Sequence, residues 1–369
     1  MPGSIKLCYG ESDMPTPAVI CEAADAAIKA GHTFYTHTAG YRELREAIAG
    51  KIHELHGVSY RASEIMSAVG ASMAIYAAIR AFVSRGDNAV IVSPAYAIFS
   101  NGVTMAGGEP RPVALVRDGR VFRLDLERVR AAIDRNTRLI IISSPSNPTG
   151  WMISVEEQRA VLELAAQHDL VILADEVYER LVYGDKPEGL SPQVAPSFAR
   201  VAGNRDRLIV VNSFSKTYNM TGWRLGWAQG SEDTIATMYR AVEFMTSNAA
   251  AMVQQAGIVA LRDGEPSIRQ LLAHYAARRA QVVAAMAKLP GVTLPEPAGS
   301  FFAFPQIEGL TDSTAFTAAL LQQTGLALAP GAAFGSDGEG YIRVCFAATE
   351  ATVTAALEKF SEFVTNRAS

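Results

Sequence analysis

The chain has 369 residues, a length that suggests about two domains at roughly 150 residues per domain. Apolar residues make up 49% and charged residues 19%, which is typical of a folded globular protein and excludes general disorder. The 37 acidic and 33 basic residues give a net charge of −4 and form no long run of either sign, so nucleic acid is not an expected partner.

No segment of the sequence predicts a membrane span or an export signal. No apolar run reaches the roughly 18 residues that cross a bilayer, because even residues 248–261 are interrupted by Gln254 and Gln255. At the N-terminus, Glu11 and Asp13 come before the apolar core of a signal peptide could form. We therefore expect a cytoplasmic protein without a membrane partner.

The cysteines and a pair of nearby histidines predict neither a disulfide framework nor a metal site. The cysteines, Cys8, Cys21 and Cys345, are too far apart for a CxxC motif, so free thiols are expected. His53 and His56 lie three residues apart on a charged stretch of helical spacing, but no third ligand is evident. We expect that this face of the helix is exposed to solvent.

Short apolar runs alternate with stretches of helical spacing as far as about residue 262. The apolar runs predict strands at 65–69, 89–92, 139–142, 171–174 and 208–211. Between them, apolar residues recur at helical spacing in stretches such as 72–83, 96–105 and 155–167. This order predicts an α/β fold of three layers, with a mainly parallel sheet covered by helices on both faces.

After about residue 262, strands and helices no longer alternate regularly in the sequence. A long helix is predicted over residues 267–287, followed by short strands such as 301–304 and 341–346 among prolines and glycines. We therefore expect two domains. The larger α/β domain would comprise residues 31–278, and the smaller α+β domain would comprise residues 1–30 and 279–369.

Polar residues follow the predicted strands, at the sheet edge where open parallel sheets bind ligands. Lys216 follows the strand at 208–211 and is either a solvated loop lysine or a desolvated amine with a lowered pKa that can form a Schiff base. Asp175 follows the strand at 171–174 and either caps a helix or pairs with a buried positive group. Residues 70–72 join a strand to a helix, so their N–H groups can face an anion.

Together these residues resemble the class I and II aminotransferases, which are fold-type I pyridoxal-phosphate enzymes. Residues 213–226 read Ser-x-Ser-Lys-x-x-x-x-x-Gly-x-Arg-x-Gly and match the family's cofactor-attachment signature throughout. Further blocks occur in the family's order at Gly10–Pro17, Tyr35–Arg45, Asn147–Gly150, Asp175–Tyr178 and Tyr341–Val344. The resemblance covers nearly the whole chain and implies aminotransferase activity, the three-layer fold and pyridoxal 5′-phosphate as the cofactor.

The resemblance implies catalytic and cofactor-binding roles for the residues at the strand ends. Lys216 would form the internal aldimine with the cofactor and, once displaced by the substrate amine, act as general acid and base. Asp175 would hold the protonated pyridinium nitrogen by its charge. Asn147 and Tyr178 would hydrogen-bond the phenolic oxygen of the cofactor, and Tyr96 would stack on its ring.

By the same resemblance, other residues would bind the cofactor phosphate and the substrate. The phosphate would be held by Ala71, Ser72, Ser213, Ser215 and Arg224. Arg343 would bind the substrate α-carboxylate as a bidentate fork, with Gly10 and Asn147 also at the substrate. Tyr35 would reach the phosphate of the neighbouring subunit, which predicts a homodimer.

Two features depart from the family pattern. The chain begins almost at the block that starts with Gly10, so the N-terminal arm and first helix that commonly embrace the partner subunit are expected to be mostly missing. The family's frequent Phe-Tyr pair in the small domain reads Phe301-Phe302 here, so an apolar contact is expected where a polar one is common.

The resemblance implies transfer of the α-amino group of an amino acid to a 2-oxo acid through pyridoxamine phosphate. A β-eliminating C–S lyase of the same fold is the first alternative, because it would use the same Lys216, Asp175 and Arg343. A non-catalytic ligand-sensing domain is a remote alternative, because such regulators carry a DNA-binding segment ahead of the cofactor domain and none fits before Gly10. Aspartate, aromatic and aliphatic amino donors all remain open.

Overall fold

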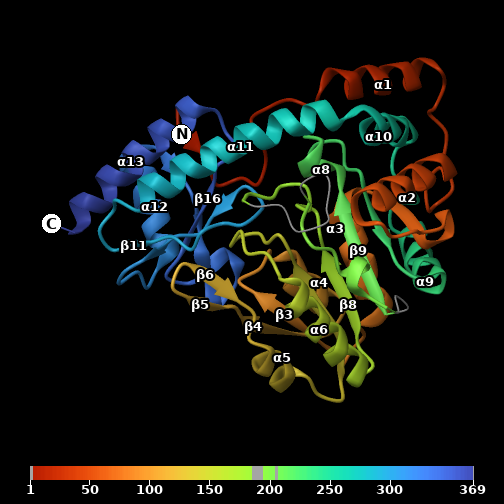
Figure 1. Ribbon diagram of the computed structural model, residues 1–369, viewed down its shortest axis with the longest axis horizontal. Helices are drawn as coiled ribbons and strands as arrows, with labels where there is room; N and C mark the ends of the chain where they lie inside the picture. Colours follow the sequence, from red (N-terminus) through yellow and green to blue (C-terminus); the bar gives the residue numbers. More distant parts are fainter. Residues whose placement is uncertain (1–2, 185–193, 204–206, 369) are drawn as a thin grey trace.

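A seven-stranded sheet forms the centre of the computed structural model, which describes residues 3–184, 194–203 and 207–368 (Figure 1). In spatial order its strands are β2 (Ile65–Ala68), β10 (Gly226–Gln229), β9 (Leu208–Ser213), β8 (Val171–Asp175), β7 (Thr137–Ser143), β3 (Asn88–Ser93) and β4 (Glu109–Ala114). β10 runs antiparallel to both of its neighbours, and the other neighbouring pairs are parallel. The predicted α/β fold with a mainly parallel sheet is therefore confirmed.

Two strands of the sheet lack the apolar run on which the strand predictions depend, and they were not predicted. β4 reads Glu-Pro-Arg-Pro-Val-Ala and lies at the edge of the sheet, where proline is tolerated because one side of the strand has no partner. β10 has only four residues and pairs with β2, which lies much earlier in the chain. Both strands therefore depend on long-range pairing rather than on a local sequence pattern.

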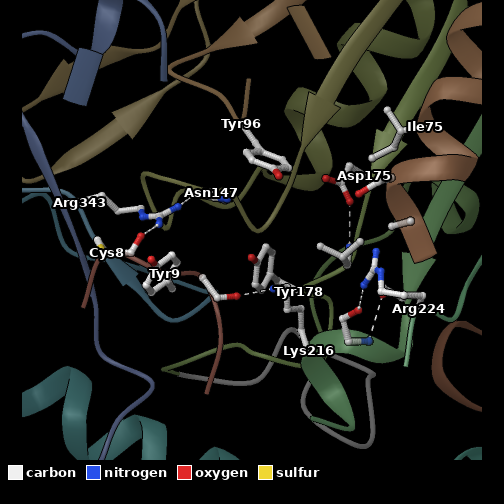
Figure 2. A pocket seen from close by; sticks show the side chains of 16 residues that line it. Cys8, Tyr9, Ile75, Tyr96, Asn147, Asp175, Tyr178, Lys216, Arg224 and Arg343 are labelled. Atoms are coloured by element: carbon white, nitrogen blue, oxygen red, sulfur yellow. Dashed lines mark hydrogen bonds between the residues drawn. The ribbon is translucent and has the colours of Figure 1, made fainter. Parts of the chain in front are cut away.

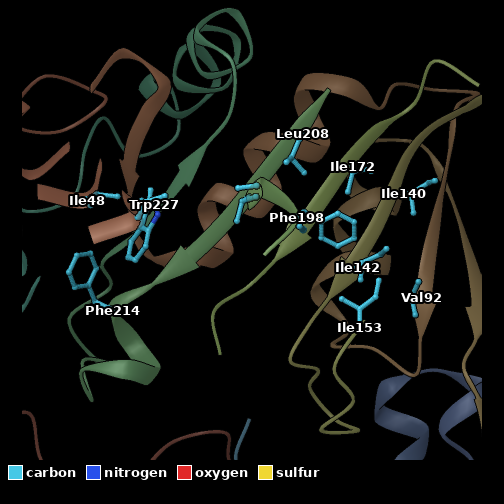
Figure 3. Close-up of a cluster of buried hydrophobic side chains, with 14 of the residues drawn as sticks. Ile48, Val92, Ile140, Ile142, Ile153, Ile172, Phe198, Leu208, Phe214 and Trp227 are labelled. Carbon is cyan, nitrogen blue, oxygen red and sulfur yellow. The ribbon is translucent and has the colours of Figure 1, made fainter. Parts of the chain in front are cut away.

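Alternate side chains of the central strands point to opposite faces of the sheet. In β8, Ile172 and Ala174 belong to one buried cluster, whereas Val171 and Leu173 belong to another. Figure 3 shows part of the first cluster, in which the ring of Phe198 lies among the strand side chains. The strands are apolar on both faces because helices cover both, as a parallel sheet requires.

Helices form the two outer layers (Figure 1). One face of the sheet packs against α3 (Gly70–Phe82), α4 (Ile98–Met105) and α9 (Glu232–Glu243). The other face packs against α2 (Arg42–His56), α5 (Leu126–Ala132), α6 (Val155–Gln167), α7 (Phe198–Val201) and α10 (Ala251–Asp263).

Local sequence sets the start of α6. The Ser154 hydroxyl accepts a hydrogen bond from the N–H of Glu157, and the Glu157 carboxylate accepts one from the N–H of Ser154.

A smaller group of elements surrounds a separate buried cluster beside the sheet (Figure 1). Its strands form three small sheets: β12 (Phe302–Ala303), β16 (Ile342–Cys345) and β15 (Ala329–Pro330); β1 (Ile5–Lys6) and β14 (Leu326–Ala327); and β11 (Val292–Thr293) and β13 (Gln306–Ile307). Its helices are α11 (Glu265–Met286), α12 (Ser313–Thr324) and α13 (Glu350–Ala368). Apart from the N-terminal helix, the remaining elements are β5 (Val116–Asp118), β6 (Val121–Arg123), α8 (Phe214–Thr217), η1 (Ala62–Glu64), η2 (Gly331–Phe334) and η3 (Ser336–Gly338).

The two groups of elements share parts of the chain. α11 runs without a break across residue 278, and it buries Ile268 in the core of the sheet but Met286 in the smaller core. At the N-terminus, β1 pairs with β14 of the smaller group. The next helix, α1 (Ala18–Lys29), packs on α10 and adds Ile20 to the core of the sheet.

Within the described ranges, no helix is both long and apolar enough to cross a membrane. The same residues contain no group of three or more His, Cys, Asp or Glu side chains placed to hold a metal ion. The three cysteines are unpaired, with Cys21 exposed and Cys345 buried.

The expectation of a solvent-exposed histidine pair is wrong for His56. His53 is exposed, but His56 is buried at the end of α2, and its Nε2 lies 2.9 Å from Oε2 of Glu179. His56 follows Ile48 and Ile52 at helical spacing, so it belongs to the buried stripe of the helix. Burial opposes a charge on His56, but the hydrogen bond and the charge of Glu179 outweigh this effect and raise the pKa of His56.

Replacing His56 with alanine leaves the buried carboxylate of Glu179 without its partner. We therefore expect His56→Ala to lower the free energy of unfolding by about 3 kcal/mol at acidic pH. The pKa of His56 is higher in the folded state than its ordinary value of 6.5. The stabilising contribution of His56 is therefore complete at pH values below 6.5 and is lost as the pH rises through the folded-state pKa. Urea unfolding at about pH 5 to 9 measures this difference.

The exposed His53 provides the matched control. His53→Ala should leave the unfolding midpoint unchanged within error, because surface substitutions usually have small effects. Equal effects of the two substitutions at every pH would contradict the stabilising role of the buried pair.

Candidate active site

A cavity of about 380 Å³ lies at the carboxyl ends of the parallel strands (Figure 2). Its walls come from the segments after β2, β3, β7, β8 and β9, and from β16 and the segment after β1. The predicted site residues that line it are Gly10, Ala71, Ser72, Tyr96, Asn147, Asp175, Tyr178, Ser213, Ser215, Lys216, Arg224 and Arg343. The cavity therefore lies at the edge where open parallel sheets bind ligands.

The cavity is also lined by four residues that sequence reasoning did not identify as site residues. Cys8 and Tyr9 directly precede Gly10, and this adjacency to a matching block was the only signal for them. Ile75 and Val177 are apolar and carry no chemical signal in the sequence.

Lys216 lies in α8, directly after β9, and extends into the cavity (Figure 2). Its Nζ donates a hydrogen bond to the carbonyl oxygen of Gly10 and lies 5.8 Å from the ring centroid of Tyr178 and 5.5 Å from that of Phe301. Burial lowers the pKa of Lys216 from 10.5 to about 8. The side chain is therefore a desolvated amine rather than a solvated loop lysine, and its neutral, nucleophilic form is populated near neutral pH.

Asp175 is the last residue of β8 and is 6% exposed. Its carboxylate accepts hydrogen bonds from the N–H of Val177 at 3.3 Å and from Oγ of Ser143, on the neighbouring strand β7, at 3.4 Å. Burial raises the pKa of Asp175 from 3.8 to about 6. It forms no ion pair with any residue that the structure describes, so the carboxylate can receive a positively charged group of a ligand.

Hydrogen-bond donors gather at the start of α3. This helix has no side-chain N-cap, so the N–H groups of Ala71 and Ser72 can bind an anion. Gly70, which has a φ of 75°, allows the guanidinium of Arg224 to approach the helix, because a side chain at this position would collide with it.

The other half of this anion site comes from the segment around Lys216. Ser213 Oγ accepts from the N–H of Ser215 at 3.0 Å, and Arg224 Nη1 donates to Ser215 Oγ at 3.5 Å. The same Nη1 donates to the carbonyl oxygen of Thr221 at 2.7 Å. Backbone N–H groups, hydroxyls and one guanidinium together form a site suited to a doubly charged oxyanion such as phosphate.

Arg343, on β16, lies at the opposite end of the cavity (Figure 2). It is 6% exposed and donates from Nη1 to Oδ1 of Asn147 at 2.8 Å and from Nη2 to the carbonyl oxygen of Cys8 at 2.6 Å. Burial lowers the pKa of Arg343, but a guanidinium stays charged at neutral pH. A buried cation with neutral partners is suited to a carboxylate ligand.

Two tyrosines line the cavity with different exposure. Tyr178 is buried, and burial raises its pKa well above 10, so its phenol stays protonated and can donate a hydrogen bond. Its ring packs edge-on against Phe301 and Phe302, at centroid distances of 5.3 and 5.8 Å. Tyr96 is 48% exposed and lies before α4, which begins at Ile98 rather than at the predicted residue 96.

Tyr35 does not line this cavity in the single chain. Its side chain is 90% exposed and stands next to Phe34, which is 80% exposed, in the segment between α1 and α2. Both residues line a separate hollow together with Asn248 and residues 250–252. Two neighbouring aromatic side chains are therefore open to solvent in this chain.

Comparisons with known proteins identify what the chain is similar to. The family model described as aminotransferase class I and II matches residues 2–360. The aspartate aminotransferase of Pyrococcus horikoshii is 34% identical over 361 residues, which cover 97% of this chain and 90% of that protein. The aspartate aminotransferase of Bacillus subtilis is 32% identical over 366 residues, with coverage of 98% and 91%. The crystal structure of an aromatic aminotransferase from Pyrococcus horikoshii superposes with a TM-score of 0.93 at 32% identity and covers 100% of this chain and 97% of that one.

The lowered pKa of Lys216 allows a direct chemical test. In the ligand-free protein, we expect acylation of Lys216 to rise with pH and to reach half of its plateau near pH 8, because the neutral amine is the reactive form. Peptide mass spectrometry measures the labelled fraction, with the exposed Lys288 as an internal reference. Half-maximal labelling of Lys216 only above about pH 10 would show that the amine is solvated.

Proposed function

The chain belongs to the aminotransferase class I and II family, and we propose that the cavity around Lys216 carries out the reaction of this family. The protein is a pyridoxal-phosphate-dependent transferase that moves an amino group between an amino acid and a 2-oxo acid. The observation that supports the proposed location is that one cavity contains a desolvated lysine, a buried carboxylate and a buried arginine.

The residues of the cavity fit this cofactor. Pyridoxal phosphate supplies an electrophilic aldehyde carbon and a ring that accepts electrons from the substrate. Phosphate would be held at the anion site by Ala71, Ser72, Ser213, Ser215 and Arg224. Asp175 would hold the protonated ring nitrogen, because a buried carboxylate without an ion pair is stabilised by a cation.

In this proposal, three side chains would contact the cofactor ring, two through hydrogen bonds to its phenolic oxygen and one by stacking on its face. Tyr178 and Asn147 would donate hydrogen bonds to its phenolic oxygen, and the high pKa of Tyr178 supports this role because the phenol keeps its proton. The ring of Tyr96, which is exposed at the cavity, would stack on the cofactor.

Lys216 has two tasks in the proposed reaction. Its neutral amine would hold the cofactor covalently, by condensing with the aldehyde and releasing water. Once free, the same amine would hold and move the proton at the substrate Cα, as general base and then as general acid. Arg343 binds the substrate α-carboxylate and turns the Cα–H bond toward Lys216, with Gly10 and Asn147 beside the substrate.

We also propose that the enzyme is a homodimer in which Tyr35 reaches the phosphate site of the neighbouring subunit. The neighbouring Phe34 and Tyr35 are each at least 80% exposed in the single chain, which supports a protein partner for this surface. The relatives that match over nearly the whole chain are aminotransferases, and they do not favour the C–S lyase alternative.

The domain division and the compartment are further parts of the proposal. The separate buried clusters support a large cofactor domain of residues 31–278 and a small domain of residues 1–30 and 279–369, with α11 contributing side chains to both clusters. The unpaired thiols of the three cysteines support a reducing compartment, which we propose is the cytoplasm.

Substitution of Lys216 tests the proposed reaction. We expect Lys216→Ala to abolish covalent attachment of the cofactor and to reduce amino transfer by roughly 10⁴-fold or more, because both tasks of the amine are lost. Lys288→Ala, which removes an exposed lysine, should behave like the wild type. Amino transfer retained by Lys216→Ala would refute the proposed role of this lysine.

Visible absorption spectra identify the amino donor and the reaction type together. We expect the yellow band of the wild-type holoenzyme to bleach when a donor amino acid is added without a 2-oxo acid. Aspartate, phenylalanine and leucine represent the three side-chain classes to be compared. A persistent yellow band with release of ammonia would instead indicate the lyase reaction.

A further inference from the structure

Arg343 is a buried cation whose hydrogen-bond partners are all neutral. Its two hydrogen bonds go to the side-chain oxygen of Asn147 and the carbonyl oxygen of Cys8. Within the part of the chain that the structure describes, it forms no ion pair, and its buried Nε has no hydrogen-bond partner. Moving a guanidinium out of water is costly, so other contacts must compensate for part of this desolvation.

Two phenylalanine rings supply such contacts. The guanidinium carbon Cζ of Arg343 lies 4.3 Å from the ring centroid of Phe302 and 4.8 Å from that of Phe334. Both distances are well inside the roughly 6 Å range of a cation–π contact. Phe302 is held on β12 opposite Cys345 of β16, and Phe334 is the last residue of η2. Both rings are buried, which strengthens their interaction with the charge.

The ring contacts leave the charge of Arg343 available to a ligand. An aromatic ring attracts the guanidinium through its π-electrons, whereas a carboxylate binds the N–H groups in the guanidinium plane. A protein carboxylate in place of the rings would neutralise the charge and occupy those N–H groups. Aromatic contacts therefore fix the side chain without competing with a substrate carboxylate.

Phe334 also connects Arg343 to the loop that carries Tyr96. The carbonyl oxygen of Phe334 accepts a hydrogen bond from the N–H of Ala95 at 3.1 Å. Its ring packs edge-on against Phe304, at a centroid distance of 6.0 Å and an interplanar angle of 88°. The backbone of Phe334 is thus tied to the loop that carries Tyr96, and its ring is buried in the core of the sheet.

We propose that Phe334 is a positioning residue for the substrate, which together with Phe302 holds the guanidinium of Arg343 in the orientation that receives the α-carboxylate. This inference rests on the proposed function, because it takes Arg343 as the residue that binds the α-carboxylate. Phe334 acts through Arg343. Its loss should therefore weaken ligands that carry a carboxylate and spare those that lack one.

Steady-state kinetics of the pyridoxal-phosphate-loaded enzyme test this inference. We expect Phe334→Leu to raise the KM for the amino acid and for the 2-oxo acid by roughly 10-fold, with kcat within about 3-fold of the wild type. Phe334→Met replaces the ring with a flexible, unbranched apolar side chain that can fill the same space in the core. It should raise the KM values to the same extent, with less disturbance of packing. Phe334→Tyr keeps the ring and should restore both KM values.

Phe304→Leu is the matched control. It removes a neighbouring buried ring that stacks on Tyr341, at 4.9 Å and 2°, and meets the edge of Phe334. We expect its KM values to stay within about 2-fold of the wild type, because the described ring contacts to the guanidinium come from Phe302 and Phe334. A 10-fold rise in Phe304→Leu as well would attribute the effect to general loss of packing and overturn the inference.

A primary amine without a carboxylate separates positioning from general damage to the site. Its half-saturation concentration, measured by the absorption change of the holoenzyme, should be the same in Phe334→Leu as in the wild type. Equal weakening of this amine and the amino acid, or an unchanged KM for the amino acid in both Phe334→Leu and Phe334→Met, would overturn the inference.

Arg343→Lys distinguishes failure of the inference from failure of the proposed function. If this variant leaves the KM for the amino acid unchanged, Arg343 does not bind the carboxylate, and both proposals fail. If Arg343→Lys raises that KM and neither Phe334→Leu nor Phe334→Met does, only the role of Phe334 fails.

Discussion

The site depends on the removal of charged groups from water at the ends of buried strands. β8 and β9 are covered by helices on both faces, so Asp175 and Lys216 leave the sheet inside the protein. Burial raises the pKa of the carboxyl group to about 6 and lowers that of the amine to about 8. Each group is thereby prepared for a ligand: the carboxylate for a cation and the neutral amine for an electrophilic carbon.

One short segment near the N-terminus holds both ends of the cavity. It follows β1, which pairs with β14 of the smaller group of elements. The carbonyl oxygen of Cys8 accepts a hydrogen bond from Arg343, and that of Gly10 accepts one from Lys216. A Cβ atom on Gly10 would lie 3.1 Å from the ring of Phe302, so a larger residue would displace this segment or the ring. This segment therefore links the two ends of the cavity through its backbone carbonyl groups.

Buried ion pairs hold the residues that follow Tyr178. Glu179 pairs with His56 of α2, and Arg180, 2% exposed, donates to both carboxylate oxygens of Glu265 at 2.9 and 3.0 Å. Glu265 begins α11, which continues into the smaller core. The loop after β8 is thus fixed to helices from both groups of elements, at a cost in desolvation that the paired charges must offset.

Local patterns in the sequence were enough to predict the fold class and to place the main polar residues at one edge of the sheet. The apolar runs and the signature at 213–226 are local patterns, and parallel strands bring their carboxyl ends together. Three features depend on burial and follow only from the packing of the chain: the pairing of His56 with Glu179, the extent to which the pKa of Lys216 is lowered, and the aromatic contacts of Arg343. Burial is a property of the packed chain, and residues far apart in the sequence create it, so no local pattern could show these features.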